Sequence, residues 1–203
     1  MKKYLFIITI TALFCAIAEA QAQGYQPRLE IGGSVGEIYR NDPRASSRNN
    51  TSFGPRLVYN KYFHSAEGPD LVLSLEGEIN WFIRDERSAF INGGHPTQGQ
   101  FGSKVGFRAD NGGFFLKAHG GFMSFGNVIR DFPADSPPRL DRMTVPIFNW
   151  GGVVELYPAR HLTVRFDIGR THLFYPHATI LGIDTPLSGK AFWQGNTGLM
   201  FTF

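Results

Sequence analysis

The side chains that could act as nucleophiles, bases or metal ligands are scattered along this 203-residue chain. Its six histidines are His64, His95, His119, His161, His172 and His177. A serine nucleophile needs a neighbouring base and a carboxylate that orients this base, but no His-x-Ser pair occurs on a strand-like segment. His64 and Ser65 are adjacent, so on a strand they would face opposite sides. The spacing gives no support for hydrolysis, and we expect no enzyme activity and no catalytic residues.

Motifs for metals and phosphates are incomplete as well. His172 and His177 are five positions apart, but neither a cysteine nor an HExxH pattern accompanies them. Lys190 follows Gly189, yet Asp184 stands where a phosphate-binding loop requires its first glycine. We therefore expect neither a metal site nor a cofactor.

The first twenty residues differ from the rest in composition. Lys2 and Lys3 precede an apolar run that ends at Ile17, and an A-x-A cleavage pattern ends at Ala20. A second such pattern ends at Ala22. The run is too short to span a bilayer comfortably as a helix. We therefore predict a cleavable signal peptide over 1–20, with cleavage after Ala20 or Ala22, in preference to a membrane anchor.

The charge and composition of the exported chain exclude several classes of protein. Removing residues 1–20 lowers the formal net charge from +3 to +2, which is too slight to indicate a nucleic-acid partner. The only cysteine, Cys15, leaves with the signal peptide, so the exported chain is stabilised by something other than disulfides. The exported chain also lacks the run of about 18 apolar residues that a transmembrane helix needs.

Most hydrophobic residues of the exported chain occur in segments where they alternate with polar residues. In segments such as 71–81 and 162–168, apolar and polar residues alternate, which sends them to opposite faces of a strand. Eight segments have this pattern: 28–40, 52–63, 71–85, 98–109, 113–130, 142–157, 161–175 and 189–203. Several exceed the ~9–11 residues that a tilted strand needs to cross a bilayer. The sequence predicts an all-β domain over 28–203, after a short periplasmic tail at 21–27.

The connections between these segments alternate in length. Those at 64–70, 110–113 and 158–160 are short, whereas four others are longer and more polar. The long connections are 41–51, 86–97, 131–141 and 176–188. Short turns on one side and long loops on the other are typical of outer-membrane barrels, and an even strand count puts both termini on the periplasmic side. We therefore predict an eight-stranded, antiparallel, up-and-down transmembrane β-barrel.

The polar face of the strands carries nearly balanced charges. Its candidate lumen residues are Glu30, Arg56, Glu76, Glu78, Lys104, Arg108, Lys117, His119, Glu155, Arg165, Asp167 and Lys190. An eight-stranded barrel is only wide enough for its side chains to fill it, so we predict a plugged polar lumen in which these charges pair. A wetter lumen with loosely solvated charges is the alternative. A soluble β-sandwich would instead bury the apolar face, and must then carry these charges at mid-strand positions outside.

The apolar face has features expected at a membrane boundary. Trp81, Trp193 and Tyr157 are candidates for the aromatic girdle. By strict alternation, Arg170 and His172 fall on the lipid face, high on the seventh segment. Headgroup phosphates would suit them there.

The end of the chain carries a family resemblance. Leu199, Phe201 and Phe203 share one face of the last segment and close it with an aromatic residue. Together with the signal peptide, the eight segments and the stretch Tyr157-Pro158 to Arg165-Phe166-Asp167, this ending resembles the OmpA/OmpX-type outer-membrane β-barrel domains. The resemblance implies that Leu199, Phe201 and Phe203 form a C-terminal assembly signal. It also implies periplasmic chaperones and the barrel-assembly machinery as partners during biogenesis, and outer-membrane lipid and lipopolysaccharide as surroundings.

These expectations combine into one functional hypothesis. We expect a monomeric, non-enzymatic integral protein of the Gram-negative cell envelope, which serves outer-membrane integrity or surface interaction through its long loops. The sequence shows no peptidoglycan-binding domain, so anchoring to the cell wall is not expected. A narrow porin-like pore for small solutes or ions is the first alternative, and an adhesin or lipid-binding barrel is the second. Balanced lumen charges favour a plugged barrel over a selective pore.

Overall fold

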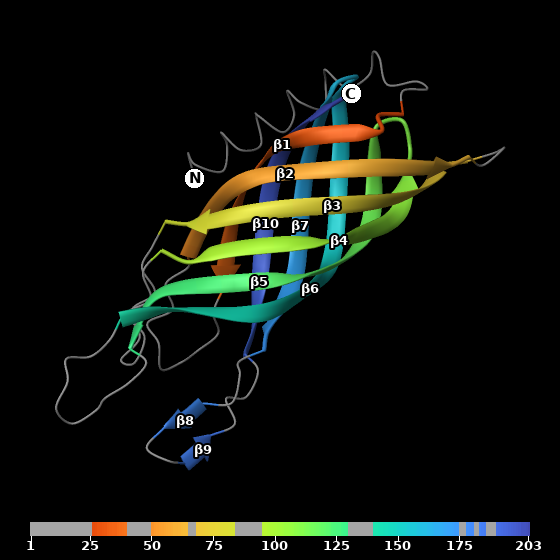
Figure 1. The fold of residues 1–203 in the computed structure, drawn as a ribbon. Helices are drawn as coiled ribbons and strands as arrows, with labels where there is room; N and C mark the ends of the chain where they lie inside the picture. Colours follow the sequence, from red (N-terminus) through yellow and green to blue (C-terminus); the bar gives the residue numbers. More distant parts are fainter. Residues whose placement is uncertain are drawn as a thin grey trace, which may run out of the picture.

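Eight long strands close into an antiparallel barrel, as the sequence predicts. The computed structural model describes residues 26–39, 50–64, 68–83, 95–129, 140–174, 178–180, 183–185 and 190–203. The barrel strands are β1 (Leu29–Tyr39), β2 (Asn50–Phe63), β3 (Asp70–Phe82), β4 (Thr97–Arg108), β5 (Gly112–Ile129), β6 (Leu140–Ala159), β7 (Leu162–Leu173) and β10 (Lys190–Thr202). Each pairs with the barrel strands that precede and follow it in this order, and β1 pairs with β10 to close the barrel (Figure 1).

The strand boundaries differ from the expected ones by a few residues, apart from one addition. Inside the expected loop 176–188 lies a small hairpin of β8 (Ala178–Ile180) and β9 (Ile183–Thr185). This hairpin lies beyond the end of the barrel at which β7 ends and β10 begins (Figure 1). We call this the loop end, and the opposite end, with the short turns, the turn end. The expected signal peptide, the tail as far as residue 25 and most of the four expected loops lie outside the described residues.

Glycines on the inner face let neighbouring strands approach closely. A Cβ atom on Gly54 of β2 would lie 1.6 Å from the carbonyl oxygen of Ile79 on β3. A Cβ atom on Gly102 of β4 would lie 2.1 Å from the carbonyl oxygen of Ala118 on β5. In both cases the obstacle is backbone, which cannot move aside. These glycines therefore permit the strong coiling of a narrow barrel.

The outer surface is apolar. Large hydrophobic side chains point away from the barrel on every long strand, with exposed fractions between 39% for Leu71 and 66% for Phe203. A soluble monomer rarely exposes more than a few hundred Å² of contiguous apolar surface. Charged and polar side chains occupy the interior instead. This distribution is that of a membrane-spanning barrel and excludes the soluble sandwich. In the part of the chain that the structure describes, no helix is long and apolar enough to cross a membrane.

The interior is not polar throughout, which corrects the expectation of a polar lumen. Toward the loop end, an apolar cluster fills the barrel. Its buried members are Ile38, Phe82, Met123, Phe125, Val145, Ile147, Leu173 and Phe192. A smaller cluster of Val72, Phe115 and Val153, with Tyr62 against it, lies toward the turn end. We call the larger cluster the apolar plug. It arises because the strands carry consecutive apolar residues near the loop end, such as Trp81-Phe82 and Ile147-Phe148, so that both faces are apolar there.

Candidate functional site

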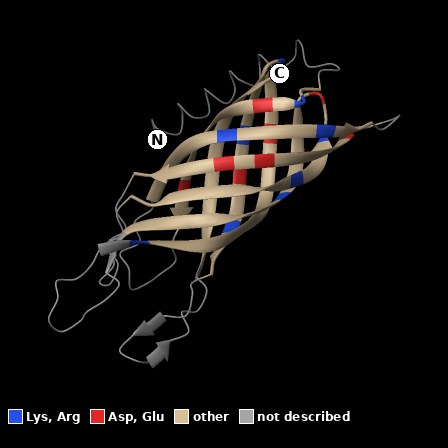
Figure 2. Ribbon diagram, viewed as in Figure 1, with Lys and Arg blue, Asp and Glu red and all other residues tan. Residues whose placement is uncertain are grey.

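The candidate site is the ionic network in the middle of the barrel. Acidic and basic residues are interspersed over neighbouring strands (Figure 2). Among the residues proposed from the sequence to line the lumen, ten are buried inside: Glu30, Arg56, Glu76, Glu78, Lys104, Lys117, His119, Glu155, Arg165 and Asp167. Arg108 is half-buried near the turn end. The side chain of Lys190 lies outside the described part of the structure.

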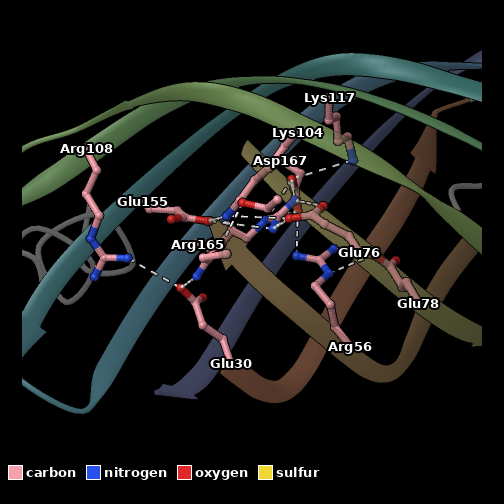
Figure 3. A network of polar contacts seen from close by, with 12 residues as sticks. Glu30, Arg56, Glu76, Glu78, Lys104, Arg108, Lys117, Glu155, Arg165 and Asp167 are labelled. Carbon is pink, nitrogen blue, oxygen red and sulfur yellow. Dashed lines mark hydrogen bonds and ion pairs between the residues drawn. The ribbon is translucent and has the colours of Figure 1, made fainter. Parts of the chain in front are cut away.

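Arg165 on β7 is the centre of the network (Figure 3). Its Nη1 and Nη2 atoms donate to the two carboxylate oxygens of Glu76 on β3 at 2.5 and 2.8 Å. Its Nε and Nη2 atoms donate to Asp167, two residues along the same strand, at 3.0 and 2.8 Å. The planar guanidinium thus binds two carboxylates at once, which is the geometry that arginine provides and lysine does not.

A second arginine extends the network through Asp167. Arg56 on β2 donates from Nη2 and Nε to Glu78 Oε2 at 2.5 and 2.8 Å. Its Nη1 atom lies 2.8 Å from Asp167 Oδ2. Asp167 therefore lies between two guanidinium groups, and Lys117 Nζ approaches it at 3.5 Å. Three cations around one carboxylate compensate the cost of burying its charge.

Lys104 on β4 connects the same centre to β6. Its ammonium group is paired with Glu155 and lies 3.5 Å from Glu76 Oε1. The nitrogen also sits over the ring of Phe115, 4.5 Å from its centroid. On the other side of Glu76, His119 Nε2 lies 3.1 Å from Oε2. Glu76 is thus contacted by three residues from three different strands.

Tyr157 corrects one expectation. The prediction that Tyr157 belongs to the outer aromatic girdle is wrong, because Tyr157 is buried inside the barrel. It lies two residues from Glu155 and therefore shares its inner face. Its hydroxyl donates to Glu155 Oε2 at 2.9 Å, and its ring stacks on the guanidinium of Arg108 at 3.8 Å.

Arg108 and Glu30 continue the network toward the turn end. Arg108 Nη1 donates to the hydroxyl of Tyr62 at 3.0 Å and lies 3.4 Å from Glu30 Oε1. Asn60 also donates to that Glu30 oxygen, at 2.6 Å. Polar contacts therefore extend from the centre of the lumen to its turn end.

A layer of neutral polar side chains separates the ionic centre from the apolar plug. Gln98 on β4 and Gln194 on β10 exchange hydrogen bonds across the lumen at 3.3 and 3.1 Å. Thr171 donates to Gln194 at 2.9 Å, and Asn149 donates to Thr171 at 2.7 Å. These neutral residues are absent from the predicted lumen set, which holds only charged residues and His119. The members of the layer occupy the same alternating positions as the charges, and that spacing could have found them.

The buried charges balance. With Arg108 included, the described interior holds five carboxylates and five permanent cations. The acids are Glu30, Glu76, Glu78, Glu155 and Asp167, and the bases are Arg56, Lys104, Arg108, Lys117 and Arg165. The described part of the lumen therefore has no excess of either sign with which to select ions. Within the described ranges, no group of three or more His, Cys, Asp or Glu side chains could hold a metal ion.

The remaining sequence candidates lie on the outer surface. Trp81 and Trp193 are 43% and 50% exposed. Leu199 and Phe201 of β10 point outward, as does Phe203 directly after the strand. The amide of Phe203 donates to the carbonyl oxygen of Leu29 at 2.8 Å, which extends the seam between the first and last strands.

Comparison with known proteins concerns the fold. No protein-family model matches this chain, and no curated protein matches it. The N-terminal β-barrel domain of Pseudomonas aeruginosa OprF is similar in structure, with 12% identity, a TM-score of 0.46 and coverage of 87% of this chain and 98% of that domain. The attachment invasion locus protein Ail of Yersinia pestis has 13% identity, a TM-score of 0.46 and coverage of 86% and 96%. Neisserial surface protein A has 12% identity, a TM-score of 0.43 and coverage of 86% and 97%.

The fold is that of an eight-stranded outer-membrane barrel. This rests on the closed strand order, the apolar exterior and the charged interior. The architecture that the resemblance to OmpA/OmpX-type domains implied is confirmed.

Proposed function

We propose that this chain is a closed, non-enzymatic integral protein of the bacterial outer membrane. It contributes to membrane integrity or interacts at the cell surface through its long connections, and it does not conduct solutes. The observation that carries this proposal is that two groups of buried side chains occupy the lumen, the ionic network and the apolar plug.

The ionic network and the apolar plug oppose conduction for separate reasons. An ion that passes the network must displace guanidinium and ammonium groups from carboxylates at distances such as 2.5 Å between Arg165 and Glu76. An ion that passes the plug must enter an apolar constriction, and such constrictions close channels by excluding water. The equal numbers of interior acids and bases also argue against a selective pore, which would favour one sign.

Single-channel recording in a planar lipid bilayer tests this proposal. Residues 21–203 are refolded in detergent, and folding is checked by β-type circular dichroism and by slower migration of the unheated protein on a gel. We expect no openings above the detergent control. Stable, uniform openings from demonstrably folded protein would overturn the closed barrel and favour the narrow pore.

Exchange of the long connections separates the two roles within the proposal. Segments 41–49, 86–94 and 131–139 and the region 175–189 are replaced singly and together by short glycine-serine turns. Loss of cell-surface binding with unchanged envelope integrity would favour surface interaction. The opposite result, in a strain tested for detergent and dye sensitivity, would favour a role in membrane integrity.

A further inference from the structure

Two basic side chains lie on the outer face of the barrel, where the surroundings are apolar. Arg170 and His172 are on β7 and alternate with the inward-facing residues of that strand. Arg170 is paired in register with Trp150 of β6 on one side and with Trp193 of β10 on the other. The arginine thus has a tryptophan as its direct neighbour on each adjoining strand.

Arg170 has no carboxylate partner among the residues that the structure describes. Ile168, its outward neighbour toward the turn end, is 62% exposed, and Phe174, beyond His172 toward the loop end, is 54% exposed. Trp150 and Trp193 are about half exposed. Among the described residues, no carboxylate lies within ion-pairing distance of the Arg170 guanidinium. An unpaired cation on a lipid-facing strand is destabilising at the midplane of the membrane and is tolerated near the interface, where anionic headgroups can pair with it.

The position of Arg170 along β7 places it near a membrane boundary. It lies eight residues beyond Leu162, the first residue of the strand. With a rise of about 3.3 Å per residue and a tilt of about 40°, this separation corresponds to roughly 20 Å of an apolar band about 25 Å tall. Arg170 is therefore near the loop-end boundary of the band, where flanking tryptophans are typical and lipid headgroups begin.

His172 supplies a second donor at the same place. The indole Nε1–H of Trp150 donates to His172 Nε2 at 3.3 Å. A neutral imidazole that accepts at Nε2 carries its proton at Nδ1, so its free nitrogen is a donor. A guanidinium recognises phosphate oxygens through paired hydrogen bonds. An arginine, an oriented imidazole and two indole rings therefore form a surface suited to a phosphate group that is attached to an apolar body.

We propose that Arg170 and His172, between Trp150 and Trp193, bind a phosphate of a phosphorylated lipid in the outer leaflet, namely lipid A of lipopolysaccharide. This inference rests on the proposed outer-membrane location. The opposite girdle residue shows the contrast, because Trp81 on β3 is paired with Phe53 and Thr97 and has no basic neighbour among them. The site is thus a feature of the β6–β7–β10 face and not of the girdle as a whole.

Binding of lipid A and of the same lipid stripped of its phosphates tests the site, since only the phosphates differ. Refolded residues 21–203 in detergent micelles are titrated with each lipid, and the lipid-bound fraction is measured by native mass spectrometry. We expect a preference for lipid A of about fivefold, which is typical of one basic side chain at an anionic surface. Arg170→Gln should remove this preference, whereas Arg170→Lys should retain part of it. Lys61→Gln is the control, because Lys61 is also exposed but lies near the turn end.

The outcomes separate this inference from the proposed function. Equal binding of both lipids by the wild type, or an unchanged preference in Arg170→Gln, would overturn the site. The wild-type comparison decides even if Arg170→Gln does not fold. Insertion of the refolded protein into phosphatidylcholine vesicles is measured in parallel. Failure to insert would overturn the membrane location and the site together, whereas insertion without a phosphate preference would overturn the site alone.

Discussion

At the scale of single residues, the interior charges depend on one another. Glu76 is contacted by Arg165, Lys104 and His119, and Asp167 lies between Arg165 and Arg56. A buried ion pair is weak evidence for net stabilisation, because desolvation offsets much of the attraction. Removal of one partner is different, since it leaves an uncompensated charge in a medium that cannot solvate it.

The variant Glu76→Gln tests this dependence. It preserves the shape of the side chain but leaves Arg165 and Lys104 with one carboxylate fewer, so we expect a loss of about 3–5 kcal/mol of unfolding free energy. Urea unfolding in lipid vesicles measures it. Asp110→Asn is the matched control, because Asp110 is exposed in a turn. An unfolding curve for Glu76→Gln that superimposes on the wild type would favour the loosely solvated lumen.

Tyr157 allows a second test at this scale. Tyr157→Phe keeps the ring that stacks on Arg108 but removes the donor to Glu155. Because hydrogen bonds to charged groups contribute about 1.5–3 kcal/mol, we expect destabilisation in this range. Tyr59→Phe, on the exposed outer face, should change stability by much less. Equal effects of the two variants in urea unfolding would contradict the interior role of Tyr157.

At the scale of elements, the strands were predictable and their partners across the lumen were not. Alternation locates each strand within a few residues, because burial on one face and lipid on the other impose a period of two. Arg165 and Glu76 are 89 residues apart in sequence, and only the barrel closure and shear bring them together. Local alternation contains no information on that contact.

The apolar plug shows a different limit of sequence reasoning. Its residues follow the same alternation as the charges, but apolar residues were expected to face outward. Adjacent apolar pairs at Trp81-Phe82, Ile147-Phe148 and Phe192-Trp193 mark the level where both faces are apolar. Aligning these pairs across strands would have revealed the plug. The error at Tyr157 has the same origin, because an aromatic residue near a strand end was assigned to the girdle regardless of its parity with Glu155.

The close approach of β2 and β3 at Gly54 leads to a prediction about stability. An added Cβ atom would meet the carbonyl oxygen of Ile79 at 1.6 Å, and no rotamer change can relieve a clash with backbone. We therefore expect Gly54→Ala to destabilise the barrel by about 1–3 kcal/mol or more. Gly120→Ala is the control, since an added Cβ there would have no atom within 4 Å. Folding yield in vesicles and urea unfolding measure both, and equal behaviour would show that β2 and β3 can separate freely.

At the scale of the whole molecule, the interior is arranged as barriers in series along the barrel. Starting at the turn end, polar contacts around Arg108 lead to the ionic centre, then to the glutamine and threonine layer, and finally to the apolar plug. The apolar plug excludes water from one side of the ionic centre. Because this lowers the local dielectric constant, the ion pairs of the centre become stronger. In the closed state that we propose, several layers of the interior therefore block the lumen together.

Conductance measurements on combined variants test whether the ionic centre and the apolar plug each block the lumen. Phe82→Ala with Leu173→Ala removes two fully buried side chains of the apolar plug, and Glu76→Gln with Arg165→Gln removes the central pair without leaving a net charge. Each pair of substitutions alone should remain silent in a planar bilayer, because the other barrier is intact. The two pairs combined should give small openings, provided that circular dichroism and gel migration show a folded barrel. Openings from the plug variant alone would mean that paired charges do not block ions, and the closed state would then depend only on the apolar constriction.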